Sequence, residues 1–125
     1  MTYKDLVDNL IKAVPEIADA YNKYLKWSGR TRDDPLPHVV FGDVLLQRFL
    51  LEELSTMKNT ELLNRIFDFF ELMAVSDDKD VRDVLSDTVL ERIGDDKRIL
   101  ENARSLMRRN TRELSDKAER FLGRL

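Results

Sequence analysis

Apolar residues recur at helical spacing along almost the whole chain, and this periodicity constrains the fold more than any other feature. Prolines, glycines and residues that commonly cap helices interrupt it at short intervals, and no stretch alternates polar and apolar residues as a half-buried strand does. Seven helices are predicted, over about residues 2–14, 15–28, 39–54, 59–73, 78–93, 95–107 and 110–125. At 125 residues the chain has the length of one domain, so we expect a single all-α bundle of about seven antiparallel helices across residues 1–125.

The third predicted helix is apolar on almost every side, which favours a place at the centre of the bundle. Its few polar residues, Asp43, Gln47 and Arg48, would then need partners inside the protein. The short connections after it predict antiparallel neighbours, so the last four helices are also compatible with two stacked hairpins. A short HEAT-like stack of helical hairpins is therefore the alternative to a plain bundle.

The charge of the chain is unevenly distributed. The formal net charge is −3, yet residues 60–96 carry 11 acidic and 4 basic side chains, a net charge of −7. Residues 97–125 carry 4 acidic and 9 basic side chains, a net charge of +5. Such an asymmetry can attract a charged partner to one side of a protein. The alternative is that neighbouring helices offset one another across an ordinary solvated surface.

The strongest candidate for a binding surface is acidic. On the fifth predicted helix, four carboxylates fall within an arc of about 80°, at about 100° per residue. The fourth predicted helix carries acidic residues opposite its own apolar arc, so antiparallel packing would place two acidic stripes side by side. Like charges at these spacings repel by a few tenths of a kcal/mol per pair, which a bound partner would offset. The predicted partner-binding residues are Asp68, Glu71, Asp80, Asp83, Asp87 and Glu91.

Two leucines, Leu72 and Leu90, project away from the apolar arcs of the fourth and fifth predicted helices. An acidic surface with apolar anchors is what a basic protein partner would bind. The alternative is an ordinary solvated face, because single exposed apolar residues are common. A second hypothesis is a self-associating scaffold protein, a homo-oligomer whose exposed contacts are Trp27, Leu72 and Leu90.

Few residues support a catalytic site. There is no cysteine and only one histidine. An enzyme would therefore have to use groups near the loop between the second and third predicted helices, which are Asp33, Asp34, His38 and Asp43. No glycine pattern forms a phosphate-binding loop, and the carboxylates around Asp78 lack the spacing of a calcium loop. We therefore expect no cofactor, no metal and no enzymatic activity.

Binding to nucleic acid or to membranes is also disfavoured. Arg104, Arg108 and Arg112 recur at four-residue spacing, but a pI of about 5.2 argues against a dedicated binder of the phosphate backbone. No apolar run approaches the roughly 18 residues of a membrane span, and the N-terminus lacks the pattern of a signal peptide. These features predict a cytoplasmic protein, most simply a bacterial one.

Three strings carry a resemblance to known proteins: PHVVFGD at residues 37–43, RIFDFFELM at residues 65–73, and the stretch from Asp78 to Gly94, which ends in LERIG. Across residues 37–122 the chain resembles small bacterial all-helical proteins, among them immunity proteins encoded beside polymorphic or contact-dependent toxins. The resemblance implies a non-enzymatic protein that neutralises a toxin by binding it directly. The acidic stripe would then cover the phosphate-binding site of a basic toxin domain.

Overall fold

The computed structural model describes residues 1–125 and contains helices without any strand, which confirms the all-α prediction. Its elements form seven continuous helical rods. Three of the rods are composite: residues 15–28 (η1 and α2), residues 37–56 (α3, η2 and α4) and residues 79–93 (α6, η3 and α7). In chain order the elements are α1 (Leu6–Ala13), η1 (Pro15–Ile17), α2 (Ala18–Ser28), α3 (Pro37–Val39), η2 (Val40–Leu50), α4 (Leu51–Thr56), α5 (Thr60–Ala74), α6 (Lys79–Asp83), η3 (Val84–Leu90), α7 (Glu91–Ile93), α8 (Lys97–Arg104) and α9 (Arg109–Phe121).

Four helix ends follow directly from the local chemistry of the chain. Asn59, Asp78 and Asp96 accept hydrogen bonds from backbone N–H groups in the first turns of α5, α6 and α8, as N-cap side chains do. Gly29 ends α2 at a φ of 74°, a left-handed conformation that glycine adopts without strain. The predicted helix starts at residues 59, 78 and 95 and the predicted end at residue 28 lie within two residues of the observed boundaries.

The first helix starts later than predicted. It begins at Leu6 rather than at Thr2, because residues 3–5 form a turn in which the Thr2 N–H donates to Asp5 Oδ1 at 2.8 Å. The N–H of Tyr3 donates to Asp78 Oδ2 at 2.8 Å. The N-terminal segment is therefore held against the turn that precedes α6.

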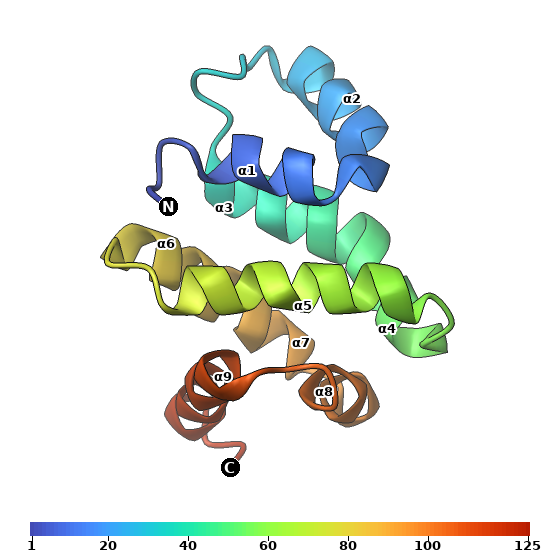
Figure 1. Ribbon diagram of the computed structural model, residues 1–125, viewed down its shortest axis with the longest axis vertical. Coiled ribbons are helices and arrows are strands. Elements are labelled where there is room, and N and C mark those ends of the chain that lie inside the picture. The colour runs from blue at the N-terminus through green and yellow to red at the C-terminus, as the bar shows by residue number, and fades with distance from the viewer.

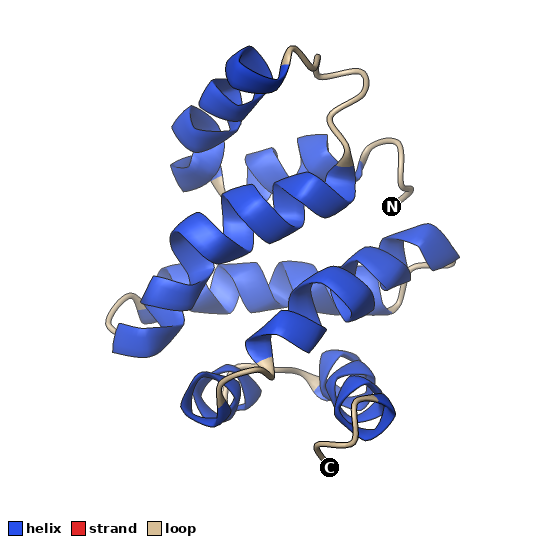
Figure 2. Cartoon of the chain, turned by 180° about the vertical axis from the view of Figure 1, so that it is seen from behind, coloured by secondary structure: helices blue, strands red, loops and turns tan.

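The rods are arranged in three tiers along the long axis of the molecule (Figure 1). α1 and α2 lie at one end, the two longer composite rods and α5 cross in the middle, and α8 and α9 lie at the other end. Seen from behind, the two composite rods lie in front of α5 (Figure 2). α8 packs on α4, whereas α9 packs on α5 and η3. α8 and α9 thus do not form the close hairpin that a HEAT-like stack requires, and a plain bundle describes the fold.

The rod α3–η2–α4 lies in the core, as its apolar sequence predicts. Its polar residues Asp43, Gln47 and Arg48 are exposed, which corrects the expectation that they need partners inside the protein. The N–H of Leu51 donates to the carbonyl of Leu46, five residues earlier, so this stretch has the wide turn of a π-helix. Segments of this kind are rare and frequently lie near functional sites. The buried residues of η2 are Val40, Phe41, Gly42, Val44, Leu45, Leu46 and Leu50.

The two π-helical segments, η2 and η3, cross at a glycine. A Cβ atom at Gly42 would lie 2.8 Å from Arg92 Nη1 and 3.1 Å from Thr88 Cγ2, so a larger residue would require these two side chains to shift. Beside this crossing, His38 Nδ1 lies 2.6 Å from Thr88 Oγ1. The side chains of Thr88 and Arg92 therefore lie directly against the backbone at Gly42.

Candidate functional site

The acidic residues of the α6–η3–α7 rod form one surface in the structure. Lys79 Nζ donates to Asp83 Oδ2 at 2.7 Å. The pKa of Lys79 is raised, first by this hydrogen bond and charge, and further by the charges of Asp80 and Asp87. All three aspartates therefore lie within electrostatic reach of one lysine. Asp80 and Asp87 are exposed and make no ion pair, so this part of the surface keeps a net negative charge.

A groove of about 240 Å³ continues this acidic surface toward α9. Asp87 and Glu91 line one wall, and Lys117 and Phe121 of α9 line the other. The carboxylate of Glu91 also makes no ion pair, and Phe121 is 85% exposed. Two free carboxylates, the unpaired ammonium of Lys117 and a large exposed aromatic ring thus face the same groove. We call Asp80, Asp87, Glu91 and Phe121 the acidic groove surface.

Apolar spacing alone places Phe121 on the buried side of the last predicted helix, and the structure corrects this, because Phe121 is exposed. The buried residues of α9 are Thr111, Ser115, Ala118 and Glu119, which leaves Phe121 on the outer face. These buried residues follow one another at intervals of four, three and one, which is a helical spacing. Three of them have small side chains, so a prediction based on the large apolar side chains missed the buried face. Small residues on the inner face let α9 lie close to α5 and η3.

The other two predicted partner-binding residues contact other segments of the chain. Asp68 Oδ1 lies 3.0 Å from Arg108 Nε, an ion pair that reaches from α5 to the start of α9. Glu71 accepts four hydrogen bonds at 2.7–3.1 Å, two from Asn110 and two from Thr111. Opposite charges on neighbouring segments offset each other at the Asp68–Arg108 pair, as the alternative interpretation of the charge pattern predicts, whereas Glu71 accepts from neutral donors.

The environment of Glu71 favours its charged form. Burial raises the pKa of this carboxyl, but the hydrogen bonds from Thr111 and Asn110 outweigh burial and lower the pKa overall. An ionised carboxylate at the start of α9 also interacts favourably with the helix dipole. Glu71 thus acts as a distant N-cap for α9 and fixes one end of the helix that carries Phe121.

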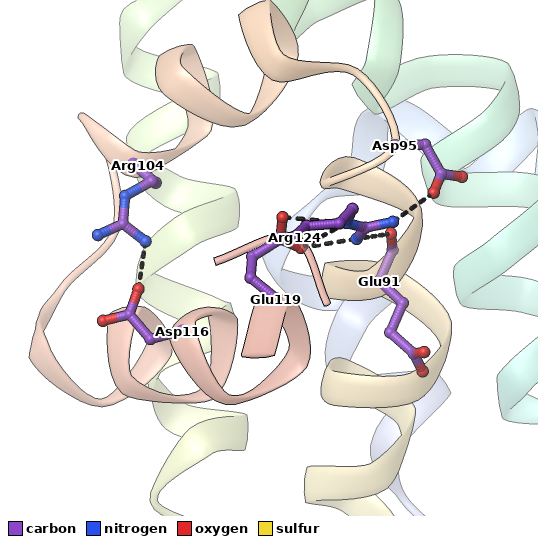
Figure 3. Close-up of polar contacts among 6 residues, drawn as sticks. All are labelled: Glu91, Asp95, Arg104, Asp116, Glu119 and Arg124. Atoms are coloured by element: carbon purple, nitrogen blue, oxygen red, sulfur yellow. Dashed lines mark hydrogen bonds and ion pairs between the residues drawn. The ribbon is translucent and has the colours of Figure 1, made fainter. Parts of the chain in front are cut away.

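The other end of α9 is fixed by a group that we call the C-terminal latch: Glu119, Arg124 and Asp95. Arg124 donates to Glu119 Oε2 at 2.6 Å, to Asp95 Oδ1 at 2.9 Å and to the backbone carbonyl of Glu91 at 2.9 Å (Figure 3). A Cβ atom at Gly94 would collide with the side chains of Glu119 and Arg124. The latch therefore holds α9 beside α7 and defines the width of the acidic groove.

The helix α9 is also tied to α8. Arg104 Nη1 donates to Asp116 Oδ1 at 2.5 Å, and Arg112 Nη2 donates to the carbonyl of Arg104 at 2.8 Å (Figure 3 shows the first contact). Because α8 ends at Arg104 and α9 begins at Arg109, the predicted arginine stripe is interrupted. Arg104, Arg108 and Arg112 therefore serve contacts within the protein rather than one continuous basic face.

The residues of the enzyme hypothesis do not meet in one cavity. Asp43 lines a groove between α2 and η2, and Asp33 lines a separate polar depression near the N-terminus. Asp34 pairs with Arg30 at 2.8 Å, and His38 contacts Thr88. No group of three or more acidic or histidine side chains is placed to hold a metal ion.

The three apolar residues of the scaffold hypothesis differ in their exposure to solvent. Trp27 is 86% exposed and Leu72 is 57% exposed, as expected. Leu90 is 1% exposed and belongs to the core, so its predicted exposure is wrong. The π-helical turn of η3 places Leu90 inward, because its spacing departs from the 100° per residue on which the prediction rested. No helix of the structure combines the length and the apolar character that crossing a membrane requires.

Comparison with known proteins gives one match. Residues 7–123 match the model of a domain of unknown function, DUF7674. No curated protein and no solved structure matches the chain.

Proposed function

The chain belongs to the DUF7674 family, and we propose that it is a non-enzymatic protein-binding module that binds a basic partner through the acidic groove surface. The observation that carries the proposal is Phe121, 85% exposed beside the unpaired carboxylates of Asp87 and Glu91. Large aromatic residues commonly anchor protein interfaces, and surrounding charges select the partner and speed its association. The polar ties at both ends of α9 support this proposal, because in the folded protein they hold the helix that carries Phe121 beside α5 and α7.

The finer proposal is that the partner is a basic toxin domain and that the chain is an immunity protein. It rests on the resemblance of residues 37–122 to immunity proteins and on the charge of the groove. A carboxylate-lined groove with an aromatic anchor would cover a basic site that otherwise binds phosphate. The scattered positions of Asp33, Asp34, His38 and Asp43 support a role in binding rather than in catalysis.

A charge-reversal capture tests the binding surface. The tagged protein is used to capture partners from the cells that produce it, at low and then at high salt. A basic protein should bind the wild type and elute as salt rises, because exposed charges are screened beyond about 10 Å at 0.1 M salt. The variant with Asp87→Lys and Glu91→Lys should lose this partner, and Phe121→Ser should weaken it.

A matched control separates the groove from the overall charge. Asp8 and Glu52 are exposed, make no ion pair and lie outside the groove, so Asp8→Lys with Glu52→Lys changes the net charge equally. Equal capture by both double variants would reject the acidic groove surface. For the finer proposal, cells that express the captured partner should grow only when the wild-type chain is co-expressed.

Self-association is the second candidate, because two apolar side chains at the C-terminal end of α5 and its C-cap are exposed. Leu72 and Val75 are 57% and 55% exposed at the end of this helix. A dimer that covers them should dissociate in the variant Leu72→Glu. Sedimentation velocity over a wide concentration range tests this, and a monomer at every concentration would reject it.

A further inference from the structure

A second groove, of about 500 Å³, lies between α2 and η2, away from the acidic groove surface. Tyr24 and Trp27 contribute aromatic rings from α2, and Val44 contributes apolar surface from η2. The Tyr24 hydroxyl donates to the carbonyl of Pro35 at 2.8 Å, so this ring is fixed in place. The groove thus combines apolar surface, chiefly the fixed ring of Tyr24 and the exposed ring of Trp27, with charged and polar side chains from both helices.

The charges around this groove are mainly positive. Lys23 on α2 and Arg48 on η2 line opposite walls, both are exposed, and neither makes an ion pair. Asp43 is the acidic residue of the groove, and its carboxylate lies 3.7 Å from Arg92. The charges left without a partner are therefore two cations that face each other across apolar surface.

The π-helical turn accounts for this arrangement along η2. Backbone bonds between residues five apart place side chains five apart on the same side of the rod. Asp43 and Arg48 are related in this way, as are Val39 and Val44, and all four line the groove. The wide turn thus brings a charged row and an apolar row to the same groove.

We propose that this groove binds an acidic, amphipathic segment of a protein partner. One or two apolar side chains of the segment lie against Tyr24 and Trp27, and its flanking carboxylates pair with Lys23 and Arg48. Grooves between two helices commonly take a helical segment in this way, with apolar anchors on one face. The charge of the expected occupant is opposite to that of the partner proposed for the acidic groove surface, and the two grooves share no lining residue.

The groove contains its own reporter, because Trp27 is the single tryptophan of the chain. The probes are a short helical peptide with leucine on one face and glutamate on both flanks, and a matched peptide with lysine in place of glutamate. The glutamate peptide should shift the Trp27 emission to shorter wavelengths in a saturable way, since the exposed indole becomes covered. The lysine peptide should not.

Variants then place the peptide in the groove. Lys23→Glu with Arg48→Glu should weaken binding of the glutamate peptide about tenfold or more, roughly 1.4 kcal/mol. Asp87→Lys with Glu91→Lys should leave its affinity unchanged, which distinguishes this site from the acidic groove surface. Binding of both peptides alike, no saturable shift, or equal affinity of the Lys23/Arg48 variant would each overturn the proposal. An emission shift that depends on protein concentration alone would overturn it in favour of a second copy of the chain.

Discussion

Glu71 offers the sharpest test of whether a predicted binding residue has a structural role. The substitution Glu71→Gln keeps the shape of the side chain but removes its charge and one of its two acceptor oxygens. Two of the four donors on Asn110 and Thr111 then face an amide NH₂ group instead of an acceptor. Thr111 is fully buried, so water cannot replace the lost acceptor there.

The expected cost follows from these contacts. A buried donor left without an acceptor costs about 1–3 kcal/mol. Loss of a carboxylate from the start of a helix adds about 0.3–1 kcal/mol. Since part of the network can relax, we expect Glu71→Gln to lower the free energy of unfolding by about 3 kcal/mol, which corresponds to a fall in Tm of about 10 °C.

Urea unfolding followed by far-ultraviolet circular dichroism measures this change. The matched control is Glu113→Gln on α9, where the exposed carboxylate lies 3.8 Å from Arg109. An exposed pair of this kind contributes less than about 1 kcal/mol, so the control should stay close to the wild type. If Glu71→Gln and Glu113→Gln unfold at the same urea concentration, the N-cap role of Glu71 is refuted.

Three further predictions concern the C-terminal latch and acid stability. Arg124→Gln should lower the free energy of unfolding by about 3 kcal/mol, because it leaves the buried Glu119 carboxylate unpaired; a urea midpoint like that of the wild type would contradict the latch. Gly94→Ala should lower the free energy of unfolding by about 2 kcal/mol, and by less in the Arg124→Gln background, since the Arg124 side chain lies against Gly94. Additive changes in a double-mutant cycle would rule out that contact. Glu71 and Asp78 have lowered pKa values in the folded protein, the first through hydrogen bonds that outweigh burial and the second chiefly through the Tyr3 N–H. The stability that these two carboxylates contribute is complete above their ordinary pKa values of 4.5 and 3.8, and it is lost as the pH falls through their lowered pKa values in the folded protein. Glu71→Gln should therefore flatten the dependence of the unfolding free energy on pH below about pH 4.5. An unchanged slope would contradict the lowered pKa of Glu71.

The helices themselves could be predicted well, because apolar spacing and capping residues are local signals. Asn59, Asp78 and Asp96 start helices, and Gly29 ends one, where the sequence pattern places these boundaries. The start of α1 was missed, because Asp5 accepts the Thr2 N–H in a turn that precedes the helix rather than in its first turn.

The candidate site could be predicted only in part, because its geometry depends on contacts between distant helices. Asp87 and Glu91 do line a groove, whereas Glu71 caps a helix that starts 38 residues further along the chain. Leu90 turned inward because η3 has π-helical spacing, which an assumed angle of 100° per residue cannot represent. Phe121 was missed because hydrophobicity alone placed it in the core, although Thr111 and its small neighbours occupy the buried face.

The way the last two helices are attached has a consequence for motion. Of the 29 buried residues in the main apolar cluster, α8 and the segments after it contribute only Ile99, Ala103 and Met107, and α9 is held largely by Glu71, Glu119 and Arg124. Segments with little apolar burial open at lower free energy than the rest of a protein. Amides of α9 should therefore exchange with deuterium sooner than those of η2. A partner that binds across η3 and α9 would slow this exchange. Binding would then rigidify α9 more than the rest of the protein, because α9 opens most readily in the free chain.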